Sequence, residues 1–233
     1  MFTPKRSDYQ VPAPLWQVLA LLLALMPAGL QAQLPAFRQV HYVGTQTILL
    51  TPGDADALSL DGPRQMQQLL QMRVDTAGVL HISEKPGAAF KQPVQIAITC
   101  RYLEAVTLGG QARLLNDVSL RQPLRLHLTG QSEANLQLEA PAAAIDAQLQ
   151  DRALLKLGGT ADTLRVAIKG DALLRAADLA ATHAELSHAG SQDALLHATG
   201  FLKIVLTGAG TVVYAGTPHL QQEVTGTGHV RRQ

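Results

Sequence analysis

Three aspartates recur at intervals that could support metal binding or acid–base chemistry. Asp151, Asp171 and Asp193 follow one another about 20 residues apart. Carboxylates that converge in one cleft are what glycoside hydrolysis or a calcium site requires. A repeat in this chain has turn positions at Asp151, Gly170 and Gly190. The three aspartates lie at offsets 0, +1 and +3 from these positions, so their side chains would not stack in register. Aspartates near turns usually accept backbone hydrogen bonds. We predict no catalytic residue here, with calcium binding as an open alternative.

Histidines provide the second chemical candidate, a zinc site from His183, His188 and His197. Zinc needs ligands that converge on one point. His183 and His188 are five residues apart, which on a continuous strand places them on opposite faces. His188 falls on the apolar parity, so we expect an inward, hydrogen-bonded neutral imidazole. The sequence therefore predicts no metal site and no cofactor.

Cys100 is the single cysteine, so no intramolecular disulfide can form. It shares the parity of the apolar positions in the segment from Val94 onward, which favours a small buried hydrophobe over a nucleophile. Intermolecular pairing in an oxidising compartment stays open. The chain also lacks a Gly-x-Ser-x-Gly elbow, a P-loop and a dinucleotide fingerprint.

The N-terminus resembles a signal peptide that comprises residues 1–32. Lys5 and Arg6 precede an uncharged core of 12 residues, Leu15–Met26, and Ala32 suits cleavage before Gln33. The alternative is a membrane anchor, but 12 residues are too short for a bilayer core of about 30 Å. We expect a periplasmic or secreted protein of the bacterial envelope, without stable membrane insertion after cleavage.

The charge balance of residues 33–233 argues against a nucleic-acid partner. Without Lys5, Arg6 and Asp8, the chain carries 17 basic and 17 acidic residues. A nucleic-acid binder would show a basic excess or stripe. Only six aromatic residues follow the signal peptide, so an extensive aromatic platform for sugars is not expected: Phe37, Tyr42, Phe90, Tyr102, Phe201 and Tyr214.

A repeat organises the elements that must position these residues. Alternating apolar residues end at a glycine, as in Leu124–Gly130, Leu164–Gly170 and Leu202–Gly208. Stacked copies of such strands, about 4.8 Å apart, would bury one continuous apolar face. The spacings of the markers are 20, 21, 19, 20, 18 and 18 residues, and the markers are Gly110, Gly130, Asp151, Gly170, Gly190, Gly208 and Gly226.

The repeat predicts an all-β fold, a right-handed parallel β-helix-like solenoid, with handedness taken from the crossover rule. Residues 36–93 read as short N-terminal strands in antiparallel arrangement, with one or two helical turns at Arg64–Gln71. Residues 94–230 form the repeat body, and 33–233 is predicted to be one domain. An Ala- and Leu-rich helix competes at Ala172–Glu185, but the markers on both sides favour strand.

Several motifs resemble the head GIN domain family of auto-transporter adhesin head domains. They are the strand Phe37–Val43, the turn Pro52–Asp56, the hairpin Val74–Ile82, and the closing segments Val212–Pro218 and Gly226–Val230. The resemblance covers nearly all of residues 36–230, and its C-terminal motif is the most specific. It implies an exported β-helical domain and an adhesion role. The Gly-x-Gly-Asp turns of the family are altered in the middle of this chain.

We therefore expect a non-catalytic binding or adhesion-type module whose ligand is unknown. A flat stacked surface suits an extended partner such as a glycan, or an envelope protein. One alternative is a structural or assembly protein that self-associates through its exposed end rungs. The other is a carbohydrate-active enzyme, which would need convergent acidic residues in one groove.

Overall fold

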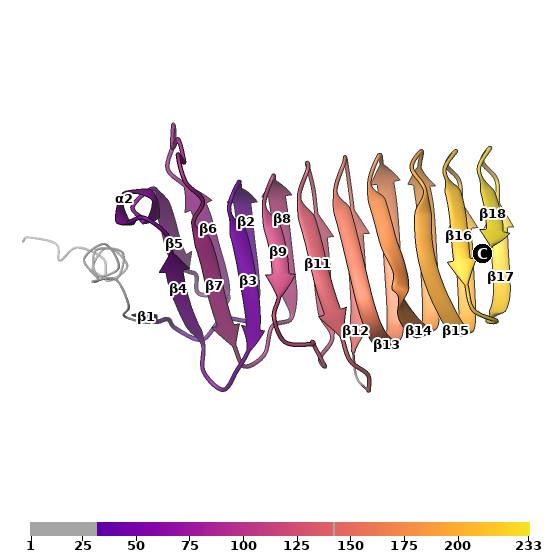
Figure 1. The fold of residues 1–233 in the computed structure, drawn as a ribbon, viewed down its shortest axis with the longest axis horizontal. Helices are drawn as coiled ribbons and strands as arrows, with labels where there is room; N and C mark the ends of the chain where they lie inside the picture. The colour runs from indigo at the N-terminus through magenta and orange to yellow at the C-terminus, as the bar shows by residue number, and fades with distance from the viewer. Residues whose placement is uncertain (1–31, 142) are drawn as a thin grey trace, which may run out of the picture.

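The computed structural model describes residues 32–141 and 143–233 as an elongated stack of strands (Figure 1). The strands lie side by side across the long axis, with the N-terminal strands at one end and the C-terminal strands at the other. The described part holds a single helix, α2 (Arg64–Gln67), within the segment predicted to turn helically. Apart from Ala32, the predicted signal peptide lies outside the described residues.

All strands belong to one continuous hydrogen-bonded sheet, which folds into two faces. Face A contains, in spatial order, β5 (Leu70–Val74), β6 (Val79–Glu84), β2 (Gln39–Gly44), β8 (Ala105–Gly110), β10 (Leu124–Leu128), β12 (Ala144–Leu149), the second halves of β13 (Leu154–Gly170), β14 (Leu173–Gly190) and β15 (Ala194–Leu206), and β17 (His219–Val224).

Face B contains the strands that alternate with these along the chain. In spatial order they are β1 (Ala32–Gln33), β4 (Ala57–Asp61), β7 (Gln95–Cys100), β3 (Thr47–Pro52), β9 (Arg113–Asn116), β11 (Glu133–Leu138), the first halves of β13, β14 and β15, β16 (Thr211–Ala215) and β18 (His229–Arg232). The predicted β-solenoid is confirmed.

Parallel pairing extends further toward the N-terminus than the sequence suggested. β2 pairs in parallel with both β6 and β8, and β3 pairs in parallel with both β7 and β9. Among the described strands, antiparallel pairing occurs only at the end of the stack, where β5 pairs with β6, and β4 pairs with β7 and β1. The N-terminal antiparallel portion therefore exists, but β2 and β3 are not part of it.

The apolar alternation explains the interior. Inward side chains from both faces form one hydrophobic column, with ladders such as Leu126, Ala147 and Val166 on neighbouring rungs. Because the outward positions between them stay exposed, each strand buries one side only. The segment Ala172–Glu185 lies mostly within β14, so the helical alternative is wrong. Neighbouring β13 and β15 supply the hydrogen bonds that override its Ala-rich helix propensity.

Two physical requirements explain the marker residues. Gly110, Gly130 and Gly170 have positive φ angles of 71°, 69° and 72°, and Asp151 adopts the same conformation at 58°. Gly208 instead has an ordinary φ, but a Cβ there would lie 2.0 Å from the carbonyl oxygen of Gly190. The early markers thus need the left-handed conformation, whereas the later ones need close stacking of backbone on backbone.

Candidate binding surfaces

A column of rings runs along the outer side of face A in the C-terminal half of the stack. His183, Phe201 and His219 occupy directly paired positions on β14, β15 and β17. The rings of Phe201 and His219 are stacked, with centroids 6.0 Å apart and an interplanar angle of 27°. Both histidines are exposed and Phe201 is half-buried, so the column forms an accessible stripe.

Beside the ring column lies a ladder of outward charges with alternating sign. Asp146, Arg165, Glu185 and Lys203 occupy matching positions on successive rungs, and Gln221 follows on β17. The Arg165 guanidinium lies 3.8 Å from the Glu185 carboxylate. Exposed pairs of this kind stabilise a fold little, but they leave donors and acceptors along a flat surface.

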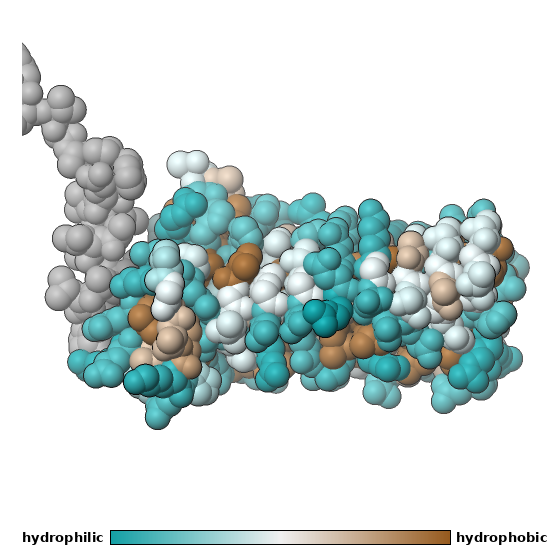
Figure 2. Space-filling model, turned by 90° about the horizontal axis from the view of Figure 1, so that it is seen from above, coloured by the Kyte–Doolittle hydropathy of each residue, from teal (hydrophilic) through white to brown (hydrophobic). Residues whose placement is uncertain are grey.

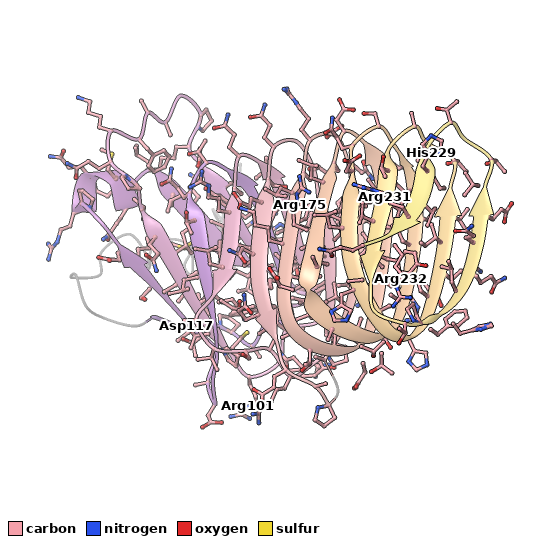
Figure 3. The ribbon with its side chains drawn as sticks, turned by 45° about the vertical axis from the view of Figure 1, so that its right-hand side comes forward. Arg101, Asp117, Arg175, His229, Arg231 and Arg232 are labelled. Carbon is pink, nitrogen blue, oxygen red and sulfur yellow. The ribbon has the colours of Figure 1, made fainter. Side chains whose placement is uncertain are left out.

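The outer side of face B has a more basic character. Lys156, Arg175, Leu195, Val213 and Arg231 occupy one outward column. Lys156 pairs with Glu133 at 2.7 Å, whereas Arg175 and Arg231 have no ion-pair partner among the described residues. Figure 3 shows both arginines on the C-terminal part of the stack, with Arg101 and Asp117 at a distant loop edge.

An aspartate–histidine pair lies on the outer side of face A near the N-terminal end. The Asp75 carboxylate accepts backbone N–H bonds from Ala77 (2.9 Å) and Val79 (3.0 Å), which close the turn between β5 and β6. Its other oxygen lies 2.7 Å from Nε2 of His81. The Val79 amide first, and His81 second, lower the pKa of Asp75. His41 follows His81 in register on β2, with ring centroids 5.6 Å apart.

A buried tyrosine locks the turn that joins the two faces at β2 and β3. The Tyr42 hydroxyl donates to Glu84 at 2.8 Å and accepts the backbone N–H groups of Thr45 (3.1 Å) and Gln46 (2.8 Å). Burial, with a smaller contribution from Glu84, raises the pKa of Tyr42 far above its usual range. Tyr42 is therefore a neutral structural phenol and not an acid–base group.

The three predicted aspartates serve the turns separately. Asp151 accepts the backbone N–H of Gly130 at 2.9 Å, and Asp193 accepts that of Thr211 at 3.1 Å. Asp171 accepts the hydroxyl of Ser191 on the next rung. Each carboxylate thus joins its own rung to a neighbouring one. The described residues contain no group of three or more His, Cys, Asp or Glu side chains suited to a metal ion.

The predicted histidines and cysteine are also separated. His188 is fully buried, with Nε2 2.7 Å from the Gln192 carbonyl oxygen, while Nδ1 accepts the Gly190 N–H at 3.3 Å. It therefore faces the interior, as predicted, and does not meet exposed His183. Cys100 is buried on face B, where burial first and Asp56 second raise the pKa of its thiol to about 12.

Cavities are shallow on this body. One groove, with a volume of about 560 Å³, lies at the loop edge between Pro52, Val118 and the Arg121–Glu139 ion pair. Figure 2 shows one long side, where hydrophobic residues form separate small groups among hydrophilic ones. Across residues 32–141 and 143–233, no helix has the length and apolar character to cross a membrane. The accessible chemistry is therefore spread over flat outer faces.

Comparison with known sequences agrees with this architecture. The sequence profile described as "Putative auto-transporter adhesin, head GIN domain" matches residues 36–218. The chain belongs to the head GIN domain family. The resemblance inferred from its strand and turn motifs is thereby confirmed. No curated protein matches the sequence significantly.

Solved structures share the head GIN fold at low sequence identity. A putative adhesin from Bacteroides fragilis is 20% identical with a TM-score of 0.73, and 87% of this chain and 95% of that chain are covered. A putative adhesin from Parabacteroides distasonis is 18% identical with a TM-score of 0.64, at the same coverages. A protein from the same organism titled putative lipid binding protein is 18% identical with a TM-score of 0.59, also at these coverages.

The ring column and the Asp75–His81–His41 group are not among the sites that the sequence predicts. The ring column did leave a signal, because His183, Phe201 and His219 are 18 residues apart, as are the last three markers. Asp75 and His81 flank a predicted hairpin turn. The position of His41 beside His81 had no such signal, because it depends on the placement of β2 next to β6.

Proposed function

We propose that this head GIN domain is an exported, non-catalytic binding module that engages an extended glycan along the outer side of face A. The observation that carries the proposal is the in-register column of His183, Phe201 and His219. The description of the family as an adhesin head domain supports a binding role. The predicted signal peptide supports placement in the periplasm or outside the cell.

The chemistry of the stripe suits sugars. The apolar side of a pyranose ring packs against an aromatic ring, and half-buried Phe201 offers such a ring. Glu185, Lys203 and Gln221 lie in the neighbouring column and can exchange hydrogen bonds with hydroxyl groups. Since successive rungs advance by about 4.8 Å, close to the length of one extended sugar unit, several units would meet equivalent positions.

A glycan array probed with the purified protein tests the proposal. We expect saturable binding to an extended neutral glycan, weakened at least tenfold by Phe201→Ala. Tyr102→Ala is the matched control, because Tyr102 is 45% exposed and lies outside the ring column. Binding that Phe201→Ala leaves unchanged would overturn the assignment of face A.

Lipid is a competing candidate ligand, since one structural relative is described as a putative lipid binding protein. Binding to lipid vesicles should therefore be measured beside the glycan array. Vesicles of phosphatidylglycerol would meet exposed Arg175 and Arg231 on the outer side of face B, with half-buried Leu195 between them. Binding to these vesicles, together with a null result on the glycan array, would replace the glycan proposal.

A second candidate function is assembly through the C-terminal rung. β17 pairs only with β15, and β18 only with β16, within the described part of the chain. Val224 on β17 is 42% exposed. Open strand edges favour pairing with another chain. Analytical ultracentrifugation should then show a concentration-dependent oligomer that Val224→Lys dissociates, and a monomer at all concentrations would exclude this function.

A further inference from the structure

We propose that His41 and His81 form a surface site for a divalent transition-metal ion of the Zn²⁺ or Cu²⁺ class, with Asp75 as the positioning residue behind His81. Such ions favour imidazole nitrogen. The site uses two protein ligands, and water would complete the coordination shell. It lies near the N-terminal end of the stack, away from the ring column, so it does not depend on the proposed glycan role.

The geometry of the two rings suits a shared ion. Their centroids lie 5.6 Å apart with an interplanar angle of 64°. With metal–nitrogen bonds of about 2.0–2.1 Å, each centroid would lie about 3.2 Å from the ion. Two rings at the observed separation would then subtend about 120° at the metal.

The backbone fixes the relative placement of the two histidines. His41 and His81 are directly paired in the parallel ladder between β2 and β6, and both point outward. His41 has no hydrogen-bond partner among the described residues, so its nitrogens are available. Formation of the site therefore requires no change in the strands.

Asp75 orients the His81 ring and fixes its tautomer, as carboxylates commonly do for metal-ligating histidines. Its Oδ2 lies 2.7 Å from Nε2 of His81, and its Oδ1 is held by the N–H groups of Ala77 and Val79. A proton on Nε2 leaves Nδ1 of the neutral ring as the metal ligand. A carboxylate behind the ring raises the basicity of the ligand and fixes its orientation.

The neighbouring residues modulate the site from both sides. Arg73 is paired with His81 on β5, and its positive charge opposes a bound cation. Thr107 is paired with His41 on β8, and His127 follows on β10. His127 is therefore two rungs beyond His41, about 9.6 Å away along the stack. This is too far to share the ion, so His127 serves as an internal control.

Isothermal titration of the untagged protein with Zn²⁺ tests the proposal. We expect one site in the wild type, with affinity reduced at least tenfold in His41→Ala and in His81→Ala. His127→Ala should bind as the wild type does. His41 is exposed and makes no hydrogen bond among the described residues, so its removal should not affect folding, which circular dichroism would check.

Asp75→Asn tests the positioning role. The turn amides would retain the Asn carbonyl as their acceptor, and the Asn amide would then donate to Nε2 of His81. The ring proton would be forced onto Nδ1, blocking the metal ligand, and Zn²⁺ affinity should fall by about tenfold or more. Long-range ¹H–¹⁵N spectra should show the tautomer change. Arg73→Gln should tighten binding.

Cu²⁺ binding followed by electron paramagnetic resonance gives a readout of the ligands. We expect coupling to two imidazole nitrogens in the wild type and to one in His41→Ala. Zn²⁺ affinities that are equal in wild type, His41→Ala and His81→Ala would overturn the site. Equal losses in His127→Ala would also overturn it, since they would indicate diffuse binding by surface histidines.

Discussion

The two ends of the solenoid close the hydrophobic column in different ways. At the N-terminal end, β5 and β4 add antiparallel strands to the edges of β6 and β7, with α2 beside them (Figure 1). Leu80 on β6 and Ile96 on β7 remain fully buried. This end is closed by additional chain, so these two residues are as buried as those in the middle of the stack.

At the C-terminal end, polar residues replace the apolar and aromatic residues that occupy the same positions on the preceding rung. Gln222 takes the place that Ile204 has on the preceding rung, and Arg232 takes that of Tyr214. Both are exposed, so polar groups face the solvent where the column ends. Terminal repeats of solenoids commonly need such polar surfaces. The N-terminal end thus buries its core beneath additional strands, whereas the C-terminal end leaves the edges of β17 and β18 accessible.

Removal of an inward leucine at each end should give the largest contrast. Leu80→Ala leaves a cavity in a fully buried site and should lower the free energy of unfolding by about 3–4 kcal/mol. Leu220→Ala at the half-buried C-terminal rung should cost less than about 1.5 kcal/mol. Urea denaturation measures both, and equal losses would contradict a difference in closure between the ends.

Backbone stacking at the later markers predicts the next effect. Gly208→Ala places a Cβ 2.0 Å from the Gly190 carbonyl oxygen, and we expect a loss of about 2–3 kcal/mol. Gly170→Asn should cost only about 1 kcal/mol, because Asn tolerates a φ of 72° and Asp151 already adopts this conformation one rung earlier. Thermal unfolding of both variants distinguishes stacking from conformation as the cause. A more stable Gly208→Ala would contradict the stacking account.

Loss of the Tyr42 hydroxyl should cost less than Leu80→Ala or Gly208→Ala. Tyr42→Phe removes an acceptor from the Gln46 N–H and a donor to Glu84, and should cost about 2 kcal/mol. Tyr214→Phe provides the control toward the C-terminal end, because no hydrogen bond of its hydroxyl is found in the described structure. Chemical denaturation should show almost no change for this control. Similar losses in both variants would indicate that hydroxyl removal acts through solvation.

The smallest effect concerns acid stability at the N-terminal end. The pKa of Asp75 is lowered in the fold, so the stability that its carboxylate provides is present above the unfolded value near 3.9. This contribution is lost as the pH falls through the lower folded pKa. Asp75→Asn should therefore flatten the decline in stability below about pH 4. Unfolding midpoints measured across this range would test it, and parallel profiles would contradict the pKa shift.

The sequence predicted the strands well because burial imposes a period of two. Residues such as Leu164 and Val166 must share one face, and the glycine markers must follow at each turn. The same pattern does not specify which strand lies beside which. The placement of β2 between β6 and β8 was therefore missed, since their apolar positions suit several neighbours equally.

The grouping of outward side chains was harder to predict, because exposure to solvent places few constraints on residue type. Asp151, Asp171 and Asp193 attracted attention through their residue type, yet each serves a local turn. Phe201 lies in a ring column that the 18-residue spacing could have revealed. The pair of His41 and His81 depends on a non-sequential contact, which no local pattern encodes.

The placement of β2 and β3 also has a consequence for the order of folding. β2 and β3 come early in the chain, but both of their neighbours on each face come later. During synthesis from the N-terminus, β2 and β3 appear before their neighbours. Tyr42 and Ile48 therefore lack their final contacts until β8 and β9 have been made. From β10 onward, the body can form by addition of one rung after another. The first rungs, which contain β2 and β3, cannot form in this way. The non-local closure of the first rungs is therefore the slow step that we expect in folding.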